Sequence, residues 1–188
     1  VYIDENFNEN VNSLDDVMKN INKKLEFPVF VKPSNSGSSV GISKANNIEE
    51  LKKAIEVAAK YDNKILIEQG IEARELECAI LGNEDVKASC VGEILPAEDF
   101  YSYDAKYKND NSRVVINAEI TKDQEKEIKE IAIKAFKALD CKGLARVDFF
   151  IDKKTEKIYL NEINTMPGFT EISMYPKLWK HSGISYSD

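Results

Sequence analysis

Four residues near the C-terminal end of the sequence carry side chains that could bind a divalent cation together with phosphate: Arg146, Asp148, Glu162 and Asn164. They lie on two predicted strands, and alternate side chains of a strand share one face. If the hairpin formed by these strands is centred on Thr155, Asp148 lies opposite Glu162 and Arg146 lies opposite Asn164. A slip of one residue in the register would separate these pairs.

Two facing carboxylates repel each other, and this repulsion favours a cation between Asp148 and Glu162. At about 5 Å and an effective dielectric constant near 20, the repulsion amounts to roughly 3 kcal/mol. Ligand sets made only of oxygen suit Mg²⁺ or Mn²⁺, and Mg²⁺ at such sites normally also binds phosphate oxygens. The alternative is a solvated strand face on which Arg146 forms a salt bridge.

Lys32 ends an apolar strand and precedes a loop of small residues, Pro33–Gly41 (PSNSGSSVG). Backbone N–H groups of such residues can approach an anion closely, and a nearby lysine adds positive charge. The loop is not a Walker A motif, because no Gly-Lys-Ser/Thr follows the glycines. The alternative is a lysine on an edge strand followed by a flexible loop.

Two further segments could contact a nucleotide or cover it. The segment Glu68–Ile71, followed by Glu75, could present backbone groups to a base edge and a carboxylate to ribose hydroxyls, although a plain turn at the end of a strand has the same appearance. The segment Phe100–Tyr107 contains three tyrosines and Lys106, which is typical of a lid that closes over a ligand. The alternative for this segment is surface packing of aromatic side chains.

The elements that must position these residues alternate between helices and strands. Hydrophobic spacing and capping residues predict helices over residues 13–25, 48–58, 121–139 and 175–181. Alternating or continuous apolar runs predict strands over residues 27–32, 64–68, 76–81, 86–94, 144–151 and 157–164. Together they predict an α+β fold with antiparallel hairpins, in which residues 95–113 form a long loop. We expect a boundary near residue 95, between domains of residues 1–94 and 95–188.

Composition excludes several classes of protein. The chain has 188 residues, with 26 Lys and Arg against 33 Asp and Glu, and its net charge of −7 disfavours nonspecific nucleic-acid binding. One His and three scattered Cys cannot form a usual zinc site, and unpaired thiols indicate a reducing, cytoplasmic compartment. No apolar run reaches the roughly 20 residues that cross a bilayer. Because position 1 is Val, we expect a fragment of a longer protein.

Five segments occur together and in one order: FVKPSNSGSSVGISK, ILIEQGIEARE, FYSYDAKY, GLARVDFF and YLNEINTMPGFTEISMYPKLW. In this combination the chain resembles the D-alanine–D-alanine ligases, a family of the ATP-grasp superfamily. The resemblance extends from about residue 27 to the C-terminus. It implies an ATP-grasp fold, in which two α+β subdomains grip ATP between them.

The resemblance also implies roles for individual residues. The residues that match ATP contacts are Lys32, Glu68, Gly70, Ile71, Glu75, Lys106 and Phe150. The residues that match the ligands of two Mg²⁺ ions, which Mn²⁺ may replace, are Asp148, Glu162 and Asn164. The residues that match groups at the tetrahedral intermediate are Arg146 and Gly168. Ser38 and Tyr107 match a pair that joins the serine-rich loop Pro33–Gly41 to the lid. Ser173 and Met174 match positions that bind the carboxylate of the second D-alanine.

The implied reaction joins two D-alanines at the expense of ATP, for peptidoglycan synthesis. The carboxylate of the first D-alanine attacks the γ-phosphate, and the amine of the second then attacks the acyl phosphate. Related ligases that make D-alanyl-D-lactate carry a lid histidine, whereas this chain has Lys106 and Tyr107 there and its only histidine is His181. We therefore expect the dipeptide as product, with D-alanyl-D-lactate or D-alanyl-D-serine ligase as alternatives and a non-catalytic nucleotide-binding module as the alternative from another class.

Some features depart from the family pattern. Ser36 stands where many members have Glu, and the stretch 114–120 lacks a proline that is common after the lid. The family's N-terminal domain binds the first D-alanine and supplies another phosphate-binding lysine, and no residue of this chain matches those roles. We therefore expect the 188-residue chain alone to bind Mg-ATP weakly and to form little dipeptide. Members of the family are commonly homodimers.

Overall fold

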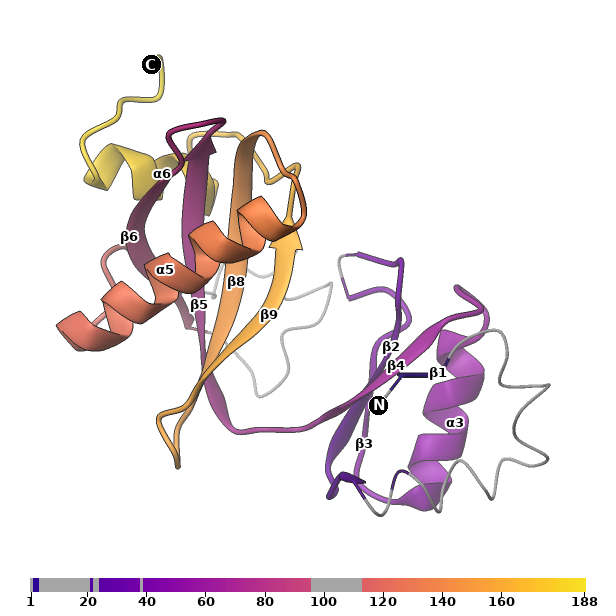
Figure 1. The fold of residues 1–188 in the computed structure, drawn as a ribbon. Helices are drawn as coiled ribbons and strands as arrows, with labels where there is room; N and C mark the ends of the chain where they lie inside the picture. The colour runs from indigo at the N-terminus through magenta and orange to yellow at the C-terminus, as the bar shows by residue number, and fades with distance from the viewer. Residues whose placement is uncertain (1, 4–20, 22–23, 38, 96–112) are drawn as a thin grey trace. The chain divides into compact units, whose positions relative to one another are not determined.

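The computed structural model describes residues 2–3, 21, 24–37, 39–95 and 113–188. It divides into two compact units, Val1–Ile71 and Glu72–Asp188, which are described separately (Figure 1). The boundary expected near residue 95 falls at the end of strand β6 (Lys87–Leu95), which pairs with neighbours on both sides in the sheet of the second unit.

The first unit is a four-stranded antiparallel sheet covered by a helix. Its strands are β1 (Tyr2–Ile3), β2 (Val29–Pro33), β3 (Ser43–Ala45) and β4 (Ile65–Gln69), in the order β1-β4-β2-β3. Helix α3 (Ile48–Ala58) starts where predicted, because the Asn47 side chain accepts a hydrogen bond from the Glu50 N–H. The helix expected over residues 13–25 lies mostly outside the described residues.

Alternation along β2 and β4 separates the core of the first unit from its polar face. Val29, Val31, Ile65 and Ile67 are buried in one cluster with α3 residues such as Leu51. The intervening side chains therefore lie on the face of the sheet away from this core. Those side chains are Phe30, Lys32, Leu66 and Glu68.

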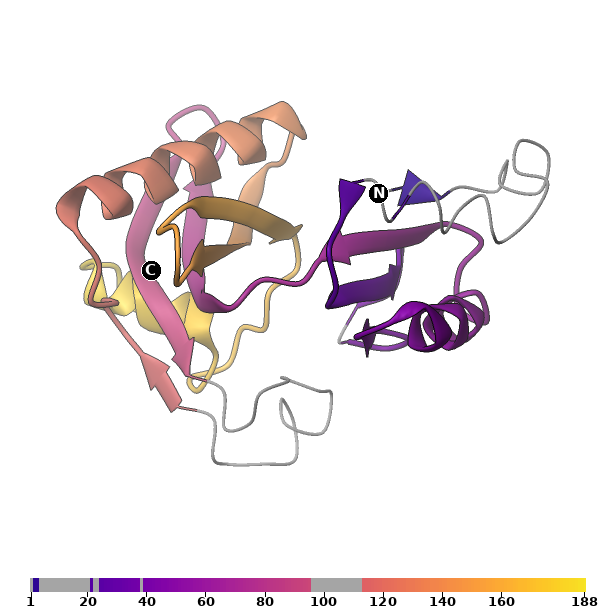
Figure 2. The same cartoon turned by 90° about the horizontal axis from the view of Figure 1, so that it is seen from below.

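The second unit is a five-stranded antiparallel sheet between two helices. Its strands are β5 (Ala73–Gly82), β6, β7 (Arg113–Val115), β8 (Gly143–Asp152) and β9 (Ile158–Asn164), in the order β7-β6-β5-β8-β9. Helices α5 (Lys122–Ala138) and α6 (Met174–His181) lie on opposite faces of this sheet (Figure 2). None of the helices in the described part of the chain is both long and apolar enough to span a membrane.

Helix α5 covers its face of the sheet along most of the strands. It begins with the predicted capping box, in which Thr121 and Gln124 exchange hydrogen bonds between side chain and backbone. Its Ile128, Ala132 and Phe136 are buried in one cluster with apolar residues of β5, β6 and β8. The side chains of β8 that alternate with this cluster, Arg146 and Asp148 among them, therefore lie on the other face of the sheet.

Helix α6 covers only part of that other face. Met174, Tyr175, Leu178 and Trp179 are buried against residues of β5 and β6 such as Ala79. Along β8 and β9 the same face instead carries the polar side chains of the predicted hairpin site. Helix α6 therefore covers this face of the sheet over β5 and β6, whereas polar side chains occupy it along β8 and β9.

Candidate active site

The predicted cross-strand pairs form in the hairpin of β8 and β9. Asp148 lies opposite Glu162, and Arg146 lies opposite Asn164. The predicted register is confirmed, but the hairpin is not symmetric about Thr155. The register shifts between Asp148 and Phe149, so one extra residue of β9, Asn161, forms a bulge that brings Glu162 opposite Asp148.

Arg146 is held by carboxylates of two strands. Its Nε and Nη2 donate to the two oxygens of Asp148, each at 2.7 Å, in a bidentate pair. Glu77 Oε2, from β5, lies 3.3 Å from the same Nε. The three side chains are 20%, 15% and 12% exposed for Arg146, Asp148 and Glu77 respectively, so this group is largely shielded from water.

The surroundings keep the guanidinium charged. Burial by itself opposes the charge, but the hydrogen bonds and negative charge of Asp148 outweigh it and raise the pKa of Arg146 above its ordinary value. The charges of Glu77 and Glu162 act in the same direction. Arg146 is therefore a permanent, oriented cation at this site.

The residues present fit a divalent cation. Three carboxylates around one guanidinium leave two negative charges uncompensated, and the oxygens of Asp148, Glu162 and Asn164 are the donors that Mg²⁺ or Mn²⁺ prefers. Asn164 Oδ1 accepts from the Met166 N–H at 3.1 Å, which orients the amide. No group of three or more His, Cys, Asp or Glu side chains in the described ranges is arranged to hold a metal, so the amide would be needed as the third ligand.

Glu75 and Phe150 lie on the same face of the sheet as Glu77 and Asp148, closer to the tip of the β8–β9 hairpin. They are directly opposite each other on β5 and β8, one alternation beyond the Glu77–Asp148 pair. Both are half-buried. A flat aromatic ring and a carboxylate therefore lie on the same face of the sheet as the acidic group.

Lys32 forms its ion pair within the first unit. Its Nζ lies 2.8 Å from Glu68 Oε2 on the neighbouring strand, and both side chains are on the face away from the core. Gly70 follows directly, with its N–H donating to Pro28 O at 2.9 Å. A Cβ at this position would lie 2.5 Å from that oxygen, so only glycine lets the chain pass toward Ile71.

The loop before α6 brings Gly168 and Ser173 together. Ser173 Oγ accepts from the Thr170 N–H at 3.1 Å, and a Cβ on Gly168 would lie 3.1 Å from that oxygen. Met174 is 7% exposed and its side chain packs into the core, so the group left for a ligand is its backbone N–H in the first turn of the helix. First-turn N–H groups of a helix are suited to a carboxylate.

Three predicted site residues lie outside the described residues: Ser38, Lys106 and Tyr107. One residue of the site was not predicted, namely Glu77. The signal available in the sequence was its spacing from Glu75, since two acidic side chains at alternate positions of a strand share a face. Its approach to Arg146 depends on the pairing of β5 with β8, which the sequence alone does not reveal.

Comparison with known proteins identifies the family. A family model described as "D-ala D-ala ligase C-terminus" matches residues 3–188. The D-alanine–D-alanine ligase of Acetivibrio thermocellus is 59% identical over 92% of this chain and 46% of its own length. That of Clostridium acetobutylicum is 53% identical over 99% of this chain and 54% of its own length. The chain thus spans about half the length of these curated relatives.

Solved structures agree with this result. The VanG D-Ala:D-Ser ligase of Enterococcus faecalis has a TM-score of 0.85 at 38% identity, over 100% of this chain and 52% of that one. The D-alanine–D-alanine ligase of Coxiella burnetii has a TM-score of 0.80 at 35% identity, over 98% of this chain and 47% of that one. These neighbours confirm the α+β ATP-grasp fold that the sequence predicted. The chain belongs to the D-alanine–D-alanine ligase family.

Proposed function

We propose that this chain forms part of an ATP-dependent ligase that joins two D-alanines into D-alanyl-D-alanine for peptidoglycan synthesis. The observation that carries the proposal is the paired register of Arg146 with Asn164 and of Asp148 with Glu162, on the face of the sheet away from α5. In a member of this family, such an arrangement supports phosphoryl transfer followed by amide formation. A cytoplasmic homodimer that uses ATP and D-alanine is part of the proposal.

The residues proposed to bind ATP are those that match the ATP contacts of the family. Lys32 would bind phosphate oxygens, and Lys106 would approach them from the lid. Asp148, Glu162 and Asn164 would hold two Mg²⁺ or Mn²⁺ ions, whose charge would offset that of the phosphates. The base and ribose would be contacted by Glu68, Gly70, Ile71, Glu75 and Phe150.

The first step transfers a phosphoryl group. A carboxylate oxygen of one D-alanine forms a bond to the γ-phosphorus, and the bond to the bridging oxygen breaks, so ADP leaves. The role of Lys32 in this step is to offset charge on the phosphates while they are held in line. The Ser38–Tyr107 pair would keep the lid closed, since water would otherwise hydrolyse the acyl phosphate.

The second step forms the amide bond. The neutral amine of the second D-alanine forms a bond to the acyl carbon, and a tetrahedral oxyanion results. The C–O bond to phosphate then breaks, and the amine proton passes to the leaving phosphate. Arg146 and the Gly168 N–H would stabilise the oxyanion. The raised pKa of Arg146 supports this role, because the guanidinium keeps its charge throughout. Ser173 and the Met174 N–H would bind the carboxylate of the second D-alanine.

The direct test is phosphate release by the full-length ligase that contains this chain, with Mg-ATP and D-alanine, D-serine or D-lactate as second substrate. We expect D-alanine to be preferred at neutral pH. The likeness to a D-Ala:D-Ser ligase makes D-serine the alternative second substrate. Preference for D-lactate would instead yield the ester D-alanyl-D-lactate. ATP binding without phosphate release that depends on D-alanine would instead indicate a nucleotide-binding module.

A further inference from the structure

The pairing of β5 with β6 contains a bulge. Cys78 pairs with Val91 and Ile80 with Ala88, so Ala79 alone lies opposite two residues, Ser89 and Cys90. A bulge interrupts the hydrogen bonds of the sheet and leaves backbone groups that need other partners. The bulge is buried, so these partners must come from the protein.

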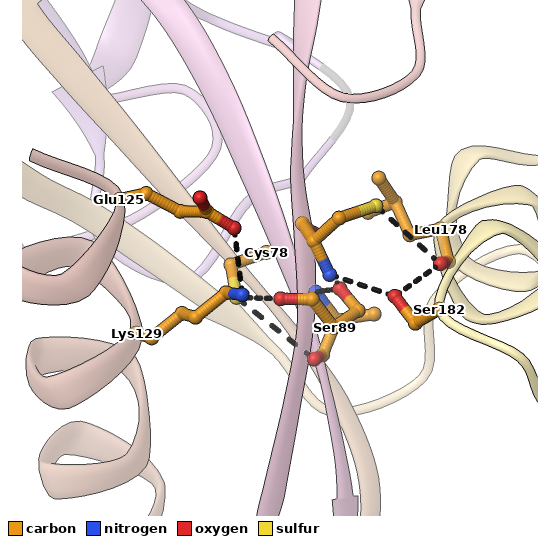
Figure 3. Close-up of polar contacts among 8 residues, drawn as sticks. Cys78, Ser89, Glu125, Lys129, Leu178 and Ser182 are labelled. Carbon is orange, nitrogen blue, oxygen red and sulfur yellow. Dashed lines mark hydrogen bonds and ion pairs between the residues drawn. The ribbon is translucent and has the colours of Figure 1, made fainter. Parts of the chain in front are cut away.

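One partner comes from within the bulge. The Ser89 hydroxyl accepts from the Ala79 N–H at 3.0 Å and donates to Cys90 O at 2.6 Å (Figure 3). Ser89 is fully buried, and both of these hydrogen bonds of its hydroxyl stay within β5 and β6. It therefore stabilises the bulge itself.

The other partners come from α6. The Cys90 N–H donates to Ser182 Oγ at 2.8 Å, and the same hydroxyl donates to Leu178 O at 2.8 Å at the C-terminal end of the helix (Figure 3). Near its N-terminal end, the Tyr175 hydroxyl donates to Ile80 O at 3.0 Å. The Cys90 thiol also donates to Leu178 O, at 3.5 Å. Helix α6 is thus attached to the strands of the bulge by one hydroxyl at each end and by this thiol.

Gly92 lets α6 lie directly on β6 between these attachments. A Cβ at this position would lie 2.8 Å from Leu178 Cδ2 and 3.1 Å from Met174 Sδ. Gly92 is also the direct partner of Glu77, which contacts Arg146. The surface on which α6 rests is therefore next to the carboxylates that hold the guanidinium.

We propose that Tyr175 and Ser182 are positioning residues that fix the N-terminus of α6, and with it Ser173 and the Met174 N–H, relative to Arg146. This inference rests on the proposed function, because it assigns the two hydroxyls to the binding of the second D-alanine carboxylate. Neither hydroxyl contacts substrate. Each acts through the helix, and a helix that shifts by even a fraction of an ångström moves its first-turn N–H groups with it.

The test compares three variants of the full-length ligase that each lose one buried hydroxyl: Tyr175→Phe, Ser182→Ala and Ser89→Ala. We expect the first two to raise the KM for the second D-alanine about fivefold, with the KM for ATP unchanged. Ser89→Ala is the matched control, because it removes a hydrogen bond of the same bulge without releasing α6. It lowers the melting temperature and leaves the second-substrate KM unchanged. Ser182→Thr keeps the hydroxyl and restores the KM.

Trp179 provides a readout that does not depend on activity. It is the single tryptophan of the 188 residues, lies on α6 and is 6% exposed. Any tryptophan elsewhere in the full-length ligase cancels in the difference between each variant and wild type. Loosening of α6 shifts its emission to longer wavelength in Tyr175→Phe and Ser182→Ala but not in Ser89→Ala. Equal KM effects in all three variants, or none in the first two, would overturn the inference. Absence of phosphate release in the wild type would overturn the proposed function instead. In that case the emission of Trp179 in the three variants would still test whether Tyr175 and Ser182 hold α6 in place.

Discussion

At the scale of single residues, the guanidinium of Arg146 is both held in a fixed orientation and kept positively charged. Its bidentate pair with Asp148 fixes the plane of the guanidinium, and Glu77 approaches the same Nε from the next strand. Each Asp148 oxygen that accepts from Arg146 retains a further lone pair, so the carboxylate can accept a cation as well. One aspartate can therefore serve both the metal and the arginine.

This dual role predicts a large effect for Asp148→Asn. The change removes one charge that we propose binds the metal and one half of the ion pair with Arg146, so we expect kcat of the full-length ligase to fall at least about 100-fold. The control is Asp152→Asn at the tip of the same hairpin, where an amide oxygen can still accept from the Lys154 and Thr155 N–H groups. Steady-state phosphate release measures both. Turnover within a few-fold of wild type in Asp148→Asn would remove this residue from the site.

At the scale of elements, the packing of α5 on β5 encloses the thiol of Cys78 and raises its pKa. Burial raises the pKa of Cys78 to about 12 from an unfolded value of 9.0. Hydrogen bonding to Ser89 and the nearby charge of Lys129, which pairs with Glu125 above it (Figure 3), offset only part of this shift. The thiol stays protonated in the folded state while the unfolded chain loses its proton above pH 9.

The expected consequence is a loss of stability at alkaline pH. Because the unfolded state binds fewer protons between pH 9 and 12, the free energy of unfolding falls there by up to about 1.4 kcal/mol per pH unit through this group. Urea unfolding of wild type and Cys78→Ala, compared from pH 8 to 11, isolates the contribution, since all other groups are shared. If the free energy of unfolding changed with pH in the same way in both proteins, the pKa of Cys78 would not be raised in the folded state.

The sequence predicted those elements whose signals are local. The capping box at Thr121, the N-cap at Asn47 and the two strands of the hairpin each depend on residues a few positions apart. The three-residue strands β3 and β7 were missed, because such short segments have no pattern of their own and form only by pairing with a neighbour. The bulges at Asn161 and at Ser89–Cys90 likewise depend on how whole strands align.

At the scale of the whole molecule, the apolar core and the charged side chains lie on different faces of the sheets. Helix α5 and its core fill one face of the larger sheet, so the opposite face can hold charged groups that a core would exclude. The smaller unit presents Lys32 and Glu68 on its own polar face in the same way. Family and fold were evident from the sequence because the motifs are continuous, whereas Glu77 and the attachment of α6 required the three-dimensional pairing.

We propose that Asp148, Glu162 and Asn164 bind a divalent cation against the phosphates of ATP, and Mn²⁺ titration followed by electron paramagnetic resonance tests this proposal. The experiment uses the full-length ligase with a non-hydrolysable ATP analogue, comparing wild type with Glu162→Gln. We expect wild type to bind Mn²⁺ when the analogue is present, and the variant to bind it at least about tenfold more weakly. Equal Mn²⁺ binding by both proteins, or none by wild type with the analogue present, would contradict the account.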